Sequence, residues 1–139
     1  MNTDTLLVAV ATGVLALVVV ATYLRLRRPH ATRRSLVSPF VRRLHTGAGV
    51  IGVLAWIAFL AAPPSSPLGT SLAGVIALFF CWLMVIAGFY LLGRWRESRG
   101  RHAGELGPRG TGPVLSALGQ VIALAAVLWL TWAYLNSMV

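Results

Sequence analysis

The residue best placed for chemistry is a histidine at the start of an apolar run. His45 follows Arg42, Arg43 and Leu44, and it precedes a run of small residues at 46–49. An imidazole is a common axial ligand of haem iron, and glycines beside it let a macrocycle approach the helix backbone. One hypothesis is therefore a b-type haem or quinone-site electron-transfer subunit in which His45 is the protein ligand.

This pattern resembles small cytochrome b membrane anchors, and the resemblance implies a second axial histidine. The other two histidines, His30 and His102, lie in polar segments. A haem at His45 would thus need a ligand from another chain, and we expect no cofactor held by this chain alone. The alternative interpretation of His45 is an interfacial imidazole that bonds to a lipid headgroup or a partner.

The remaining candidates for chemistry are few. Gln120 is the one amide well inside an apolar run, and we expect it to face protein and to bond to another helix. Cys81 is the single cysteine, so the chain has no internal disulfide and no CxxC motif. No Gly-rich phosphate loop or acidic metal-ligand cluster accompanies these residues, so we expect no enzymatic activity and no metal site.

The elements that must position these residues are membrane helices. Of the 139 residues 58% are hydrophobic and 11% are charged, against about 25% charged in soluble domains. The surplus apolar surface predicts an all-α integral membrane protein, an antiparallel bundle of four transmembrane helices in a single membrane domain, 1–139. The predicted spans are about 6–24, 44–62, 68–93 and 113–135, and the predicted cytoplasmic loops are 25–43 and 94–112.

Two Ser-Pro pairs predict helix starts. Ser38 is expected to cap a helix whose first residue is Pro39, and Ser66 and Pro67 repeat the arrangement before the third span. The connection between the second and third spans is short, so these spans are expected to be antiparallel neighbours.

The arginines predict the orientation of the chain. All twelve basic residues are arginines, seven in 25–43 and five in 94–112, and none lies at either terminus or in the hairpin at 63–67. The positive-inside rule then places both termini outside the cytoplasm. Arginine without lysine indicates a GC-rich bacterial genome, and therefore the bacterial cytoplasmic (inner) membrane. Nucleic acid is not an expected partner. The expected partners include anionic lipid headgroups, which would bind at Arg27, Arg28, Arg33, Arg34, Arg42 and Arg43.

The predicted spans contain no Asp, Glu, Lys or Arg, which argues against transport coupled to protons or cations. Small multidrug exporters match in size and helix number, but they depend on a glutamate in the first span. Here the polar residues of that span are Thr12, Thr22 and Tyr23.

Small residues mark faces where helices can approach closely. The candidate packing or partner residues are Ala48, Gly49, Gly52, Gly69, Ala73, Ser116 and Gln120. We expect the face with Ala48 and Gly52 to meet another integral-membrane protein. The favoured hypothesis is a non-catalytic accessory subunit of a larger bacterial membrane complex, respiratory or otherwise bioenergetic.

Overall fold

The computed structural model describes residues 3–26, 38–102 and 112–139. In these ranges it contains four α-helices, α1 (Thr3–Leu26), α2 (Pro39–Ala61), α3 (Ser71–His102) and α4 (Gly112–Leu135). A short 3-10 helix, η2 (Pro67–Gly69), lies between α2 and α3. The described part of the chain is therefore all-helical, as the sequence predicts.

Each helix has a stretch that is long and apolar enough to cross a membrane. The four stretches are Thr3–Leu24, Pro39–Ala61, Ser71–Gly93 and Val114–Leu135. At about 1.5 Å per residue they rise roughly 33 Å, slightly more than the 30 Å or so of a hydrocarbon core. Large apolar side chains, among them Leu17, Leu54 and Ile86, are exposed on the outside. This is the architecture of a multi-pass membrane protein.

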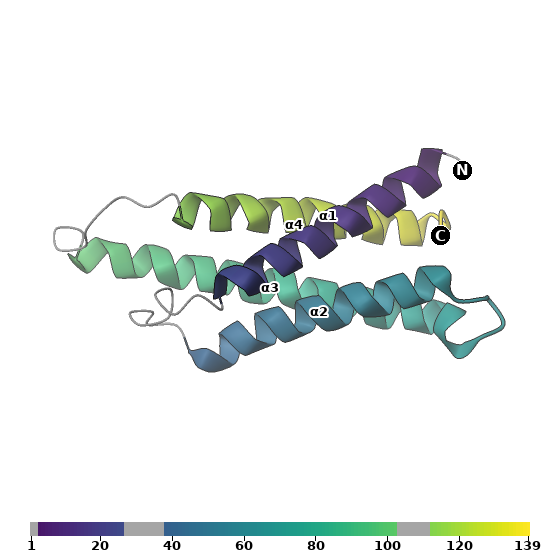
Figure 1. Cartoon of the computed structure of the whole chain (residues 1–139), viewed down its shortest axis with the longest axis horizontal. Helices are drawn as coiled ribbons and strands as arrows, with labels where there is room; N and C mark the ends of the chain where they lie inside the picture. Colours follow the sequence, from purple (N-terminus) through teal and green to yellow (C-terminus); the bar gives the residue numbers. More distant parts are fainter. Residues whose placement is uncertain (1–2, 27–37, 103–111) are drawn as a thin grey trace.

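The helices form a ring in which each contacts two neighbours. α2 packs most extensively on α3, and α1 on α4, while smaller contacts join α3 to α4 and α1 to α2. Consecutive helices alternate in direction, so both termini and the connection at 62–70 lie at one end of the bundle (Figure 1). We call the opposite end, where α2 begins with Arg42 and Arg43, the arginine end.

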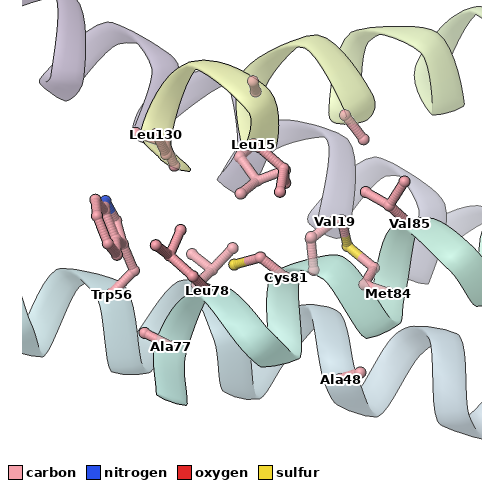
Figure 2. Close-up of a cluster of buried hydrophobic side chains, with 14 of the residues drawn as sticks. Leu15, Val19, Ala48, Trp56, Ala77, Leu78, Cys81, Met84, Val85 and Leu130 are labelled. Atoms are coloured by element: carbon pink, nitrogen blue, oxygen red, sulfur yellow. The ribbon is translucent and has the colours of Figure 1, made fainter. Parts of the chain in front are cut away.

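Side chains from all four helices meet inside the ring (Figure 2). Leu15 of α1, Trp56 of α2, Cys81 of α3 and Leu130 of α4 are fully buried and belong to one apolar cluster. Cys81 is a free thiol that packs there as a small apolar residue. The core therefore lies along the bundle axis and leaves the outward faces for lipid.

The start of α2 is confirmed. Ser38 is its N-cap and accepts a hydrogen bond from the Phe40 backbone N–H at 3.3 Å, and Pro39 is the first helical residue. The candidate membrane stretch also begins at Pro39, five residues before the predicted span. Arg42 and Arg43 lie near the start of this stretch, which is defined by length and composition alone.

The turn before α3 differs from the prediction. Ser66 caps helical residues that begin at Pro67, and its hydroxyl oxygen accepts from the Gly69 N–H at 3.2 Å. These residues form only η2, and α3 begins at Ser71. Gly69 lies so close to the Pro63 carbonyl that a Cβ would overlap it. Gly69 thus permits a tight turn, where the sequence suggested a helix-packing face.

α3 is longer than its membrane stretch. The candidate stretch ends at Gly93, and the helix continues to His102 through residues that were expected to form a loop. The segment 94–102 contains one glycine and no proline, and arginine and glutamate are good helix formers. The rest of that predicted loop, 103–111, lies outside the described residues.

Candidate functional site

His45 lies inside the contact between α2 and α3. Its side chain is 8% exposed, and its Nδ1 is 2.8 Å from the backbone carbonyl oxygen of Met84. A carbonyl oxygen can only accept, so Nδ1 carries the proton and donates it. In the neutral ring the lone pair is then on Nε2. The headgroup or partner contact suggested by the sequence is replaced at Nδ1 by a bond to the neighbouring helix.

Gln120 makes the corresponding bond from α4. Its side chain is also 8% exposed, and its Nε2 donates to the carbonyl oxygen of Val85 at 2.8 Å. The amide group occupies the space beside Gly88, where an added Cβ would overlap it. The absence of a side chain at Gly88 therefore makes room for this interhelical bond.

Met84 and Val85 are consecutive residues, so α3 is held from both sides at one level. We call the His45 and Gln120 side chains, with these two carbonyls, the polar layer. Each carbonyl oxygen has two lone pairs, so it can accept a side chain without giving up its helical bond. The polar layer joins α2, α3 and α4.

Aromatic donors make further bonds between helices. Trp56 Nε1 of α2 donates to the Thr12 hydroxyl of α1 at 3.2 Å, and Trp82 Nε1 of α3 donates to the Thr131 hydroxyl of α4 at 3.1 Å. Tyr134 of α4 donates its hydroxyl to the carbonyl of the first residue of α3 at 2.7 Å. Sequence reasoning missed these pairs. The available signal was an indole or phenol inside an apolar span, which needs a partner there.

The two threonines serve as acceptors because their own protons are used locally. Thr12 donates to the Val8 carbonyl at 2.8 Å, and Thr131 donates to the Val127 carbonyl at 2.7 Å, each one turn back along its helix. Among the described residues, Trp129 Nε1 is the buried side-chain nitrogen or oxygen without a partner.

The small residues of α2 face α3 of the same chain. A Cβ at Gly52 would lie 2.9 Å from the Cys81 backbone nitrogen, and one at Gly49 would lie 2.8 Å from the Met84 sulfur. Ala48 is buried in the same region (Figure 2). The face that the sequence suggested for another protein is thus occupied by α3. Of the two glycines proposed to admit a haem beside His45, Gly49 is filled by Met84, whereas nothing lies within 4 Å of a Cβ at Gly47.

The other predicted site residues are spread over the bundle. Ala73 is half-buried in α3, and Ser116 is exposed on α4. Arg42 is half-buried and Arg43 is exposed at the start of α2. Arg27, Arg28, Arg33 and Arg34 lie outside the described residues. Among the residues that the structure describes, no three His, Cys, Asp or Glu side chains are grouped as a metal site would require.

Comparison with protein-family models, with curated proteins and with solved structures finds no match to this chain.

Proposed function

We propose that this chain is a non-catalytic accessory subunit of a larger bacterial membrane complex, of respiratory or other bioenergetic kind. The observation that carries the proposal is that the buried polar side chains are engaged in hydrogen bonds within the bundle. Thr12, His45 and Gln120 each bond to backbone carbonyls inside the bundle. Polar groups committed in this way stabilise helix association, where lipid removes the hydrophobic driving force between helices.

We further propose an orientation in which the arginine end faces the cytoplasm and both termini are extracytoplasmic. The support is the distribution of all twelve arginines between 25–43 and 94–112. Both termini lie at the end of the bundle away from the start of α2 (Figure 1). The corresponding location is the bacterial cytoplasmic (inner) membrane.

A second candidate is an electron-transfer subunit in which His45 Nε2 binds a haem whose other ligand comes from another chain. The observation that favours it is the Nδ1 bond to Met84, because a metal-ligating histidine commonly donates its other N–H to a carbonyl. The filled space at Gly49 and Gly52 counts against a macrocycle on that side of α2. An optical spectrum of the reduced, purified complex separates the two candidates. A b-type band that disappears in His45→Ala favours the haem.

The accessory role is tested by purifying the tagged chain from membranes in a mild detergent and identifying the proteins that co-migrate with it. The expected result is a fixed set of integral-membrane proteins in constant proportion to the tagged chain. A matched preparation in a harsh detergent should release them. If the chain purifies alone from membranes in which it is abundant, the accessory-subunit proposal is lost.

A further inference from the structure

The first turns of α2 present an aromatic ring and two cations at the surface of the arginine end. Phe40 is 69% exposed, although it is a large apolar residue. Arg43, three residues on, is also exposed, and Arg42 is half-buried. We call these three residues the basic-aromatic patch.

The length of α2 indicates the depth at which this patch lies. Its 23 residues rise about 34 Å, roughly 4 Å more than a hydrocarbon core, so one end reaches the headgroup layer. Arginine side chains near a helix end extend toward that layer, and amphipathic surfaces there combine cations with aromatic rings. Because cations are costly in the hydrocarbon core, we infer that the arginine end of α2 is the end that reaches the headgroups.

The first turn of α2 contains no acidic residue, so no carboxylate in that turn balances the charge of the patch. Asp4, in the first turn of α1, lies at the opposite end of the bundle. Cations near the start of a helix are also disfavoured by the helix dipole. An anion from outside the bundle would remove both penalties.

We propose that the basic-aromatic patch binds the phosphate of anionic phospholipid headgroups, with the Phe40 ring inserted at the boundary with the acyl chains. Charge complementarity selects an anionic over a zwitterionic lipid, and the exposed ring selects a lipid over a free anion. The proposal does not depend on the accessory-subunit role, since it concerns the lipid-facing surface of the isolated chain.

The experiment measures thermal unfolding of the full chain in neutral detergent micelles that contain increasing fractions of phosphatidylglycerol. Phosphatidylcholine with the same acyl chains is the lipid control. We expect stabilisation by phosphatidylglycerol alone. Each arginine near the surface contributes about fivefold in affinity, so Arg43→Gln should raise the lipid fraction at half-effect about fivefold, and the Arg42→Gln/Arg43→Gln double variant roughly 25-fold.

A matched control is Arg99→Gln/Arg101→Gln, which removes the same charge from a segment of the sequence outside the patch. Since the proposal assigns lipid binding to the patch, this variant should raise the lipid fraction at half-effect much less than the Arg42→Gln/Arg43→Gln double variant does. An equal loss in the control variant, equal stabilisation by phosphatidylcholine, or full replacement of the lipid by inorganic phosphate would each overturn the proposal. Arg43→Gln, at an exposed position, keeps the test valid if the double variant does not fold.

Discussion

The imidazole Nδ1 of His45 and the backbone carbonyl of Met84 lie 2.8 Å apart across the contact between α2 and α3. Gln120 binds the next carbonyl, that of Val85, from α4. Together the two bonds define both the rotation of α3 and its position along the bundle axis. Apolar packing alone would restrict the rotation and axial position of α3 less. Lipid tails are as apolar as the helix surfaces, so there is no hydrophobic driving force that favours one arrangement.

His45→Ala should lower the free energy of unfolding by roughly 1–3 kcal/mol, about 1 kcal/mol from the lost hydrogen bond and the rest from the cavity. His45→Gln, whose amide can also donate to a carbonyl, should recover part of the loss. The measurement is reversible unfolding in mixed micelles. A His45→Ala protein as stable as the wild type would show that the bond contributes nothing to the bundle.

Gly52→Ala and Gly13→Ala form a matched pair. At Gly52 the new Cβ would lie 2.9 Å from the Cys81 nitrogen and 3.1 Å from the Phe80 carbonyl carbon, whereas no atom lies within 4 Å of a Cβ at Gly13. Overpacking at Gly52 should cost about 1–3 kcal/mol. Gly13→Ala should be neutral or stabilising by up to about 1 kcal/mol, because alanine favours helix. Comparable destabilisation of both variants would contradict the α2–α3 packing.

Gly88 and Gln120 should be strongly coupled. A Cβ at Gly88 would overlap the Gln120 amide, so Gly88→Ala should displace it and break its bond to Val85. In the Gln120→Ala variant the space beside residue 88 is empty, so adding Gly88→Ala to that variant should change the free energy of unfolding little. A double-mutant cycle on unfolding free energies should give a coupling of about 1 kcal/mol or more. Additive effects within about 0.3 kcal/mol would mean that the two residues do not meet.

The sequence was sufficient to predict the helices but not how they are rotated. Apolar runs and arginine positions located all four helices, and the Ser38-Pro39 pair located the start of α2 to the residue. Near α3 the prediction was less accurate. Pro67 begins only a short 3-10 helix, and α3 itself starts at Ser71. α3 then extends nine residues past Gly93, in a segment without proline.

The site residues show the same division. The inward position of Gln120 could be predicted, since an amide is costly to leave in lipid. Its acceptor could not, because any helical carbonyl can accept and only tertiary packing selects Val85. The small residues at Gly49 and Gly52 signalled close approach correctly, but spacing along one helix does not say whether the approaching backbone belongs to the same chain.

The most direct test of the account concerns the membrane bundle itself and its orientation. Two reporters are fused in turn after Val139, a fluorescent protein that matures only in the cytoplasm and a phosphatase that is active only outside it. With four membrane-crossing helices and the arginine end in the cytoplasm, the phosphatase fusion should be active and the fluorescent fusion dark, both at normal abundance in the membrane. A bright fluorescent fusion with an inactive phosphatase fusion would contradict the orientation, and recovery of the chain in the soluble fraction would contradict the membrane bundle.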